Sequence, residues 1–246
     1  MNQTDGCSLQ CRGATENHEP AAPVSLKFSE KYDREHSRQY FEKHQATISR
    51  RLSNWREMQM ARQALRLAGE PSSVLDLPCG AGRFWPLLVE KPDRRVLAAD
   101  NSADMIAIAR QHQPSAITDR VETFQTSAFA IDLPDNAVET VFSIRLLHHI
   151  ERSGHRLTIL REYARVANSS VILSLWVDGN YKAWRRRRLE QARAQRGESA
   201  SNANRFVVAR QQIEAEFDTA GFDIVAHLDF VPKYAMWRTY VLRKRT

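Results

Sequence analysis

Short apolar runs alternate with amphipathic stretches through the middle of the chain. Several of these runs lack polar alternation, as in "SVILSLWV" at 170–177, which is typical of strands that are covered on both faces. Between them, apolar residues recur at helical spacing. The alternation predicts an α/β fold with a mainly parallel sheet. Predicted strands span residues 73–77, 95–100, 120–126, 138–144 and 170–177, and predicted helices span 82–91, 102–113 and 155–168.

The pattern changes after residue 204. An amphipathic stretch at 205–222 predicts a helix that ends with Gly221 in the position after its last turn. Two further apolar runs, 222–230 and 235–244, are joined by a short link through Pro232. A link this short requires an antiparallel pair. We therefore expect one reversed strand at the C-terminal edge of the sheet.

The N-terminal quarter differs from the rest. Residues 1–25 are polar and rich in Pro and Gly, which predicts a disordered tail. From about residue 29 to 67 the spacing turns helical, and "GEPSS" then breaks the helix. We predict a helical lid at 26–70 and one domain at 71–246, with a basic insert at 178–205.

Composition narrows the class of protein. The chain has 246 residues and three cysteines, Cys7, Cys11 and Cys79, which form no zinc-like set with histidines. We expect a reducing compartment and no metal site. No apolar run approaches the roughly 20 residues that span a bilayer, and the N-terminus lacks the apolar segment of a secretory signal. These features favour the cytoplasm.

The net charge of +7 is concentrated in one place. Residues 182–196, "KAWRRRRLEQARAQR", hold seven Lys or Arg and one Glu, a net charge of +6, so the remainder carries about 7 − 6 = +1. Such a run is either a solvated helix face or a site for phosphate, carboxylate or acidic lipid headgroups. An arginine-rich helix beside aromatic residues also suits RNA. The near-neutral remainder disfavours nucleic acid.

Candidate chemistry begins at the first turn, "VLDLPCGAGRF" (74–84). Gly80 and Gly82 allow a sharp bend and a close approach of backbone to a ligand. Pro78 stands where a dinucleotide fingerprint needs its first glycine, which excludes that motif. Asp100 ends the second predicted strand and suits the two hydroxyls of a ribose. The alternatives are a structural turn and an aspartate that only caps the next helix.

Five segments, in order, resemble class I S-adenosylmethionine-dependent methyltransferases. They are "VLDLPCGAGRF", "VLAADNSADMIAIAR", "AFAIDLPDNAVETVFSIRLLHHI", "LREYARV" and "AGFDIV". The resemblance covers roughly residues 70–246. It implies a Rossmann-like, doubly wound, seven-stranded, mostly parallel sheet with a C-terminal antiparallel hairpin and an N-terminal helical lid. The implied cofactor is S-adenosyl-L-methionine.

The resemblance also implies a set of cofactor-binding residues. Asp76 and the Gly80–Gly82 backbone match the motif that contacts the methionine part, and Asp100 matches the acidic residue on the ribose. Ser127 and Ala128 replace the family's usual Gly-Asp-Ala-like step, and Glu139 replaces its usual aspartate in the fourth strand. The full set is Asp76, Pro78, Gly80, Gly82, Asp100, Asn101, Met105, Ser127, Ala128 and Ile144.

A histidine pair follows the fourth predicted strand. Similar enzymes place such a pair near the methyl group, so His149 and His148 are the candidate catalytic bases. A base is needed only when the acceptor arrives protonated. The alternative is a packed histidine that bonds to backbone, more so for His148 than for His149. No Asn-Pro-Pro-Tyr-like step follows the strand, which favours oxygen over nitrogen as the acceptor atom.

Two segments are candidates for covering the acceptor. Residues 32–45 are aromatic-rich, and the insert after the fifth strand carries aromatics and arginines. In the first segment the aromatics also suit simple docking of a helix on the domain, and in the second the arginines also suit a solvated helix face. The candidate acceptor-binding residues are Tyr32, Tyr40, His44, Arg145, Tyr181, Arg185 and Arg188.

The sequence thus predicts a methyltransferase for a small or lipid-linked, anionic acceptor, with O-methylation favoured. It would be cytoplasmic, with an anionic membrane surface as a further partner at the inner face of a membrane. The first alternative is an RNA methyltransferase. The second is a non-catalytic protein that binds S-adenosylmethionine, because Ser127 and Glu139 depart from the family's pattern. The sequence gives no indication of the oligomeric state.

Overall fold

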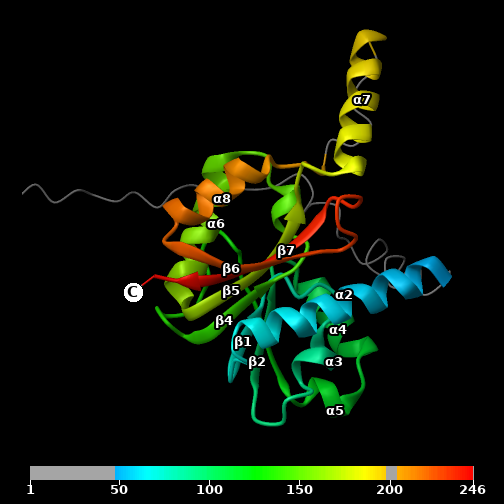
Figure 1. Cartoon of the computed structure of the whole chain (residues 1–246). Coiled ribbons are helices and arrows are strands. Elements are labelled where there is room, and N and C mark those ends of the chain that lie inside the picture. The colour runs from blue at the N-terminus through cyan, green and yellow to red at the C-terminus, as the bar shows by residue number, and fades with distance from the viewer. Residues whose placement is uncertain (1–47, 198–203, 246) are drawn as a thin grey trace, which may run out of the picture.

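The computed structural model describes residues 48–197 and 204–245, which form a sheet covered by helices on both faces (Figure 1). The seven strands lie in the order β3-β2-β1-β4-β5-β7-β6. All neighbouring pairs are parallel except those that β7 makes. The predicted fold class is therefore confirmed. The strands are β1 (Ser73–Asp76), β2 (Arg95–Asp100), β3 (Val121–Gln125), β4 (Val138–Ser143), β5 (Ala167–Trp176), β6 (Phe222–Asp229) and β7 (Trp237–Lys244).

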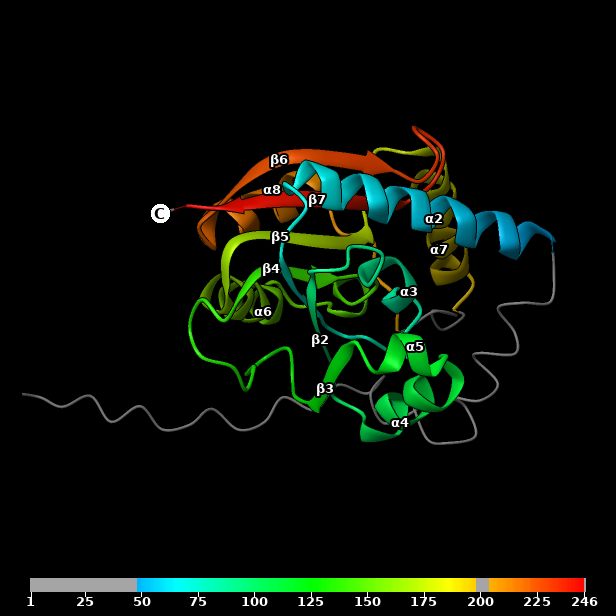
Figure 2. The same cartoon turned by 90° about the horizontal axis from the view of Figure 1, so that it is seen from below.

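The helices form two layers. Apolar residues of α2, α3 and α4 pack on one face of the sheet, and those of α6 and α8 pack on the other. Figure 2 shows α2 running along β7 and β6 at one side of the molecule. Each helix of the described residues is too short or too polar to cross a bilayer. The helices are α2 (Ile48–Leu67), α3 (Trp85–Leu88), α4 (Ala103–His112), α5 (Ser115–Thr118), α6 (Ser153–Val166), α7 (Tyr181–Gln195) and α8 (Arg210–Thr219), with a 3-10 turn, η2, at Leu147–His149.

The reversed strand is not where the sequence places it. We expected it at the edge of the sheet, whereas β7 lies between β5 and β6, and β6 forms the edge. Burial explains the order. Five successive residues of β7, from Arg238 to Leu242, are buried, whereas three residues of β6, from Asp223 to Val225, are exposed. The short link fixes the antiparallel pairing, but only burial decides which strand goes inside.

The helix predicted at 82–91 is much shorter. Gly82 has a φ of +69°, which keeps it out of the helix, and Pro86 follows at the start of α3. At the other end, the buried Arg94 donates a hydrogen bond to the carbonyl oxygen of Leu88 (3.3 Å). These contacts leave a single helical turn, Trp85–Leu88. Of the helical stretch predicted from about 29 to 67, the described part, 48–67, is helical, and the rest lies outside the described residues. The other predicted helices and strands agree with the structure to within a few residues, except that the last helix starts at Arg210 rather than 205.

The strand order creates one switch point, between β1 and β4. From β1 the chain winds outward through β2 to β3, and from β4 it winds the other way to β5. In open α/β sheets a crevice forms at such a point, outside the carboxyl ends of the strands. The turn after β1 and the residues after β4 both lie at this edge.

Candidate active site

Asp76 closes β1 and is buried at the carboxyl edge of the sheet. The turn that follows it is held from both sides, because Leu77 donates its N–H to Phe142 of β4 (3.0 Å) and Cys79 donates its N–H to Ala99 of β2 (2.8 Å). One carboxylate oxygen of Asp76, Oδ2, has no hydrogen-bond partner. Burial raises the pKa of this carboxyl well above its usual range, and the charge of Asp100 adds to the effect.

Glycine is favoured at positions 80 and 82 for two different structural reasons. At Gly82 a Cβ atom would lie 2.8 Å from the ring of Trp85, so this glycine is required by packing. At Gly80, with a φ of +53°, a Cβ atom would meet only Met105, at 3.7 Å. Gly80 therefore faces open space on its other sides. The half-buried Pro78 precedes them, joined to Leu77 by a cis peptide bond.

Asp100 links the ends of β1 and β2. Its carboxylate accepts the N–H of Gly80 through Oδ2 and that of Ser102 through Oδ1, both at 3.0 Å. The cap of α4 is Ser102, whose hydroxyl accepts the N–H of Met105 (3.3 Å), so Asp100 does more than cap a helix. Burial raises the pKa of Asp100, and the two N–H donors oppose that rise. Its remaining lone pairs are available to further donors.

The other predicted cofactor residues lie along the same edge. Asn101 is exposed after β2, and Met105 is buried below Gly80. Ser127 lies in a turn after β3, where its hydroxyl accepts the N–H of Phe129 (3.2 Å), and the adjacent Ala128 packs against the core. The structure thus places the residues after β1, β2 and β3 side by side, in the order that the sequence predicts.

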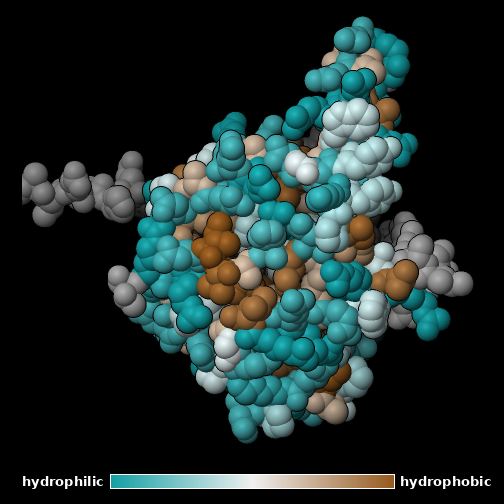
Figure 3. All heavy atoms as spheres, viewed as in Figure 1, coloured by the Kyte–Doolittle hydropathy of each residue, from teal (hydrophilic) through white to brown (hydrophobic). Residues whose placement is uncertain are grey.

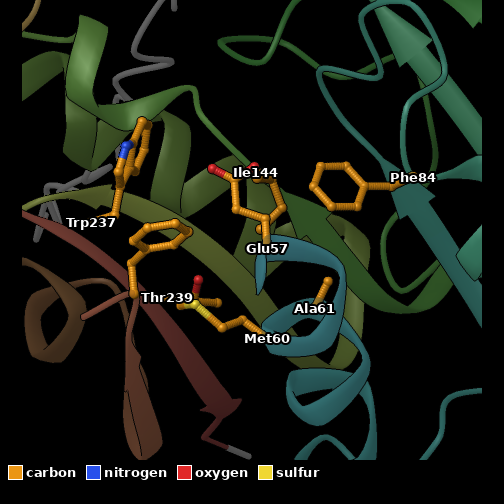
Figure 4. Close-up of a pocket in the computed structure, with 8 residues that line it drawn as sticks. Glu57, Met60, Ala61, Phe84, Ile144, Trp237 and Thr239 are labelled. Atoms are coloured by element: carbon orange, nitrogen blue, oxygen red, sulfur yellow. The ribbon is translucent and has the colours of Figure 1, made fainter. Parts of the chain in front are cut away.

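A pocket opens beside Ile144, the first residue after β4. It is lined by α2, by β7, and by Phe84 from the first turn, and it holds about 320 Å³ including the solvent at its mouth. Figure 4 shows Trp237 and Phe84 on opposite sides, with Glu57, Met60 and Ala61 of α2 between them. Sequence reasoning missed this contribution of α2. The full lining is Glu57, Met60, Ala61, Phe84, Ile144, Phe230, Trp237 and Thr239.

Glu57 joins two arginines at this pocket. Its carboxylate forms ion pairs with Arg83, from the first turn, and with Arg145, which follows β4. The guanidinium of Arg145 also lies over the ring of Trp237, 5.2 Å from its centroid, and its backbone N–H donates to Ser174 of β5 (3.0 Å). Arg145 adopts a φ of +69°, which is uncommon for a residue with a side chain. Several elements therefore fix Arg145 beside the predicted cofactor edge.

His148 is enclosed by aromatic rings. Its ring lies 4.0 Å from that of His149, 4.7 Å from Trp237 and 5.3 Å from Trp176, measured between centroids. It is 3% exposed, and its Nδ1 has no partner. Burial, with the nearby His149, Arg205 and Arg145, lowers its pKa to about 2. His148 is therefore neutral near pH 7 and a weak base.

His149 is more accessible and is held by a backbone contact. Its Nδ1 lies 2.6 Å from the carbonyl oxygen of Asn204, an arrangement that needs a proton on this nitrogen. Burial lowers the pKa of His149, the carbonyl raises it, and the charge of Arg205 lowers it further. Of the two histidines, His149 is therefore the better placed to exchange a proton.

Two tryptophans and two more arginines complete this part of the edge. Trp176 ends β5 and pairs in register with Trp237, which begins β7. The guanidiniums of Arg186 and Arg205 lie 5.3 and 5.8 Å from the centre of the Trp176 ring. The indole Nε1 of Trp176 is buried without a partner. Because β7 is antiparallel, its first residue, Trp237, reaches the carboxyl edge of β5. Sequence reasoning missed Trp237, because no local pattern reports this register.

Some predicted residues lie elsewhere. Tyr181, Arg185 and Arg188 belong to α7, which projects from the body of the molecule (Figure 1), and all three are exposed. Glu139 lies at the opposite end of β4, where it accepts the N–H and the hydroxyl of Ser72 (2.6 and 2.8 Å), so its role here is structural. The tail at 1–25 and the residues Tyr32, Tyr40 and His44 lie outside the described residues.

Residues 74–170 match the family model described as a methyltransferase domain. The chain contains a class I S-adenosylmethionine-dependent methyltransferase domain. The matched range includes the first turn, Asp100 and the histidine pair, and it ends within β5. The aromatic and arginine residues of α7 and β7 lie beyond the matched range.

Two curated methyltransferases are similar in sequence. The mouse tRNA (carboxymethyluridine(34)-5-O)-methyltransferase ALKBH8 is 24% identical over 212 residues, which is 82% of this chain and 30% of that protein. The trans-aconitate 2-methyltransferase of Azoarcus sp. (strain BH72) is 31% identical over 113 residues, 46% of this chain and 41% of that protein. The chain thus aligns with well under half of the length of each relative.

Solved structures show the same methyltransferase-type fold. The magnesium protoporphyrin IX methyltransferase ChlM of Synechocystis PCC 6803, with bound S-adenosylhomocysteine, matches with a TM-score of 0.64 and 14% identity, over 81% of this chain and 89% of that chain. The [4+2]-cyclase SpnF matches with a TM-score of 0.55 and 16% identity, over 76% and 82%. At these identities the likeness concerns the fold alone, and the acceptor must be argued from the site.

The described residues fit the cofactor of this methyltransferase domain. The unpartnered Oδ2 of Asp76 is a buried acceptor that suits an ammonium group, and Asp100 retains lone pairs for two hydroxyls. Gly80 leaves open space between them. S-adenosylmethionine carries both of the matching groups: an amine and a ribose with two free hydroxyls.

Proposed function

We propose that this methyltransferase domain acts on an oxygen of an anionic acceptor, small or lipid-linked, and specifically on a carboxylate. The observation that carries the proposal is the electrostatic setting of the histidine pair. Arg205 and Arg145 lower the pKa of His148, and Arg205 lowers that of His149, so the potential at the pair is positive. A positive potential favours a negatively charged acceptor at this position.

The low basicity of the pair supports the same proposal. A hydroxyl acceptor requires a base to remove its proton, whereas a carboxylate is already ionised near pH 7. S-adenosylmethionine supplies an activated methyl group when it is bound. The remaining task of the protein is to orient the acceptor and to exclude water. Trp176 and His148 are buried, the half-buried Trp237 packs against both rings, and the three side chains suit this task.

Three side chains beside the histidine pair can recognise a carboxylate. Arg145 and Arg205 supply the charge, and the buried Nε1–H of Trp176 is an unused hydrogen-bond donor. Glu57 holds the guanidinium of Arg145 in place from α2. A guanidinium has five N–H donors, so an ion pair with Glu57 still allows a second acceptor. In this proposal His149 positions the acceptor rather than removing a proton.

The test uses S-adenosylmethionine with a labelled methyl group and a fractionated cell extract. Methyl esters of carboxylates release methanol under mild alkali, whereas methyl ethers and N-methyl groups do not. We expect the label to enter the small-molecule or lipid fraction and to become volatile after alkali. The Arg205→Gln variant should raise the apparent KM for the acceptor and leave cofactor binding unchanged, because Arg205 is proposed to contact only the acceptor.

Alkali-stable label would contradict the carboxylate, and label in no fraction would contradict the transfer itself. The matched control is Arg161→Gln, which changes an exposed arginine on α6, on the far face of the sheet. Equal loss of activity in this control and in Arg205→Gln would show that the effect is a general one of net charge.

RNA methylation is the second candidate, and the similarity to mouse ALKBH8 over 82% of this chain supports it. The same assay separates the two, because label would then enter the RNA fraction. RNA binding would also weaken steeply as salt is added, with a linear dependence of log affinity on log salt. We favour the small or lipid-linked acceptor, in the cytoplasm or at the inner face of a membrane, because the net charge outside residues 182–196 is only about +1.

A further inference from the structure

Apolar and aromatic side chains are exposed together where α7 leaves the body of the molecule. Five of them, from α7 and from the loop between β6 and β7, are between 42% and 54% exposed. Figure 3 shows pale and brown residues over this part of α7, surrounded by hydrophilic residues. With four neighbouring cations they form what we call the α7 base patch. It consists of Tyr181, Trp184, Leu189, Val231 and Tyr234 with Lys182, Arg185, Arg188 and Lys233.

The patch is held together by backbone contacts. Tyr181 and Lys182 donate their N–H groups to the carbonyl oxygens of Lys233 and Tyr234, at 2.9 and 3.0 Å. The rings of Tyr181 and Tyr234 are stacked, with centroids 5.7 Å apart and an angle of 11° between their planes. The start of α7 is therefore fixed to the β6–β7 loop, and the patch is a preformed surface.

Helix geometry brings the outer cations to the same side. Positions 181, 184, 185 and 188 are three or four residues apart, so they share one face of α7. Two cations lie directly over rings of the patch: Lys182 over Tyr234 at 5.1 Å and Arg188 over Trp184 at 5.2 Å. The only carboxylate on the described helix, Glu190, is paired with Arg186 on another face.

We propose that the α7 base patch binds an anionic phospholipid surface. Tyrosine and tryptophan are favoured at the boundary between headgroups and acyl chains, and lysine and arginine are attracted to acidic headgroups. The patch presents both kinds of side chain on one exposed surface. Leu189 and Val231 add aliphatic area, which an acyl boundary can bury.

The ring arrangement favours lipid over RNA. Single-stranded RNA binding uses aromatic faces on which bases can stack. In the patch each of these rings already has a face in contact: Tyr181 and Tyr234 stack on each other, Lys182 lies over Tyr234 and Arg188 lies over Trp184, which leaves less ring surface for bases. Exposed aliphatic side chains give RNA nothing to bind.

The position of the patch connects a membrane with the active site. α7 follows β5 by a short loop, and the end of β5 is Trp176, at the carboxyl edge of the sheet. A surface bound at the base of α7 would therefore adjoin the edge at which Asp76, Asp100 and Arg145 lie. Binding of the surface itself does not depend on the acceptor proposed above.

The experiment is vesicle flotation with the full chain. Vesicles of phosphatidylcholine alone are compared with vesicles of equal parts phosphatidylcholine and phosphatidylglycerol. We expect binding to the anionic vesicles, weakening as salt is added. The double variant Arg185→Gln/Arg188→Gln should lower the affinity by on the order of 30-fold, and Trp184→Ser should lower it further without changing the salt dependence. Binding of S-adenosylmethionine should be unchanged in all variants, which shows that they are folded.

The matched control is Arg66→Gln/Arg161→Gln, which removes two exposed arginines from α2 and α6. Equal loss in the control and in the α7 variant would overturn the proposal, because net charge alone would explain the binding. Absence of binding to anionic vesicles would overturn it as well. A third outcome would also overturn it: the intact chain shifts an RNA oligonucleotide in a gel, and the α7 variant loses this RNA binding but binds vesicles as well as the intact chain does. None of these outcomes bears on methyl transfer, which the labelling assay measures separately.

Discussion

Two buried carboxyl groups at the ends of neighbouring strands dominate the chemistry of this site. Asp76 and Asp100 both have raised pKa values because of burial, and Asp76 is further affected by the charge of Asp100. Only Asp100 is stabilised by backbone N–H groups. The two carboxyls are therefore not equivalent: backbone N–H groups favour the ionised form of Asp100, whereas Oδ2 of Asp76 has no hydrogen-bond partner.

The role of Asp100 can be tested by Asp100→Asn. The amide offers one acceptor oxygen in place of two, so it leaves either Gly80 or Ser102 without its partner as well as reducing the acceptors for a ribose. We expect binding of S-adenosylmethionine to weaken by about 1–3 kcal/mol in calorimetry. The control is Asp93→Asn, an exposed residue in the loop before β2. Unchanged affinity would remove Asp100 from the cofactor site.

His148 should make the protein sensitive to acid. Its pKa is lowered from 6.5 to about 2 in the folded chain, so below pH 6.5 the unfolded chain binds a proton that the folded chain does not. The contribution of the neutral His148 to the free energy of unfolding is complete above pH 6.5 and is lost as the pH falls toward 2. Between pH 7 and pH 5 the loss amounts to about 2 kcal/mol.

The His148→Phe variant should abolish this part of the acid sensitivity. The free energy of unfolding, measured in urea, should fall less between pH 7 and pH 5 in the variant than in the parent chain, by about 2 kcal/mol. Other groups titrate in both chains and cancel in the comparison. Parallel curves for the two chains would mean that His148 is protonated normally in the folded protein.

At the scale of elements, α6 and α8 are joined by a buried ion pair. Arg156 donates to both carboxylate oxygens of Glu216, at 2.8 and 2.5 Å, and Ser153 donates to the same carboxylate at 2.7 Å. Both partners are at most 5% exposed. A buried charge that loses its partner is costly, so Glu216→Ala should reduce the free energy of unfolding by about 3–5 kcal/mol.

The paired variant Arg156→Met/Glu216→Leu separates charge from packing. It replaces the ion pair by apolar residues of similar size, and such replacements are often neutral or stabilising. We expect it to recover most of the stability lost in Glu216→Ala, as measured by urea denaturation. A double variant as unstable as the single one would show that the hydrogen bonds of Arg156 to the carbonyls of Ile150 and Glu151 matter more.

Most elements could be predicted from the sequence because their burial is local. Strands such as β2 have an unbroken apolar centre, 96–99, and α4 is preceded by a cap residue, Ser102, that the sequence shows directly. The length of the first helix after β1 could not be predicted, because it depends on Gly82 packing against Trp85 and on Arg94 reaching back to Leu88. Those are contacts across a turn, and periodicity does not report them.

At the scale of the whole molecule, the sequence predicts that Asp76, Gly80 and Asp100 lie close together. It does not predict that Glu57, Trp176 and Trp237 do. Asp76, Gly80 and Asp100 follow successive strands, so knowing the sheet was sufficient to bring them together. Glu57, Trp176 and Trp237 come from three separate elements, and their meeting depends on β7 lying inside the sheet and on α2 packing across it. No local pattern contains that information.

The place of β7 inside the sheet also constrains how the chain is assembled. β6 is synthesised before β7, yet it has no neighbour in the sheet except β7. Until β7 begins to leave the ribosome, β6 can form none of its strand pairs, and until β7 is complete β5 has a partly bare flank. During synthesis, the half of the sheet that carries Asp76 and Asp100 is therefore complete well before the half that carries Trp237.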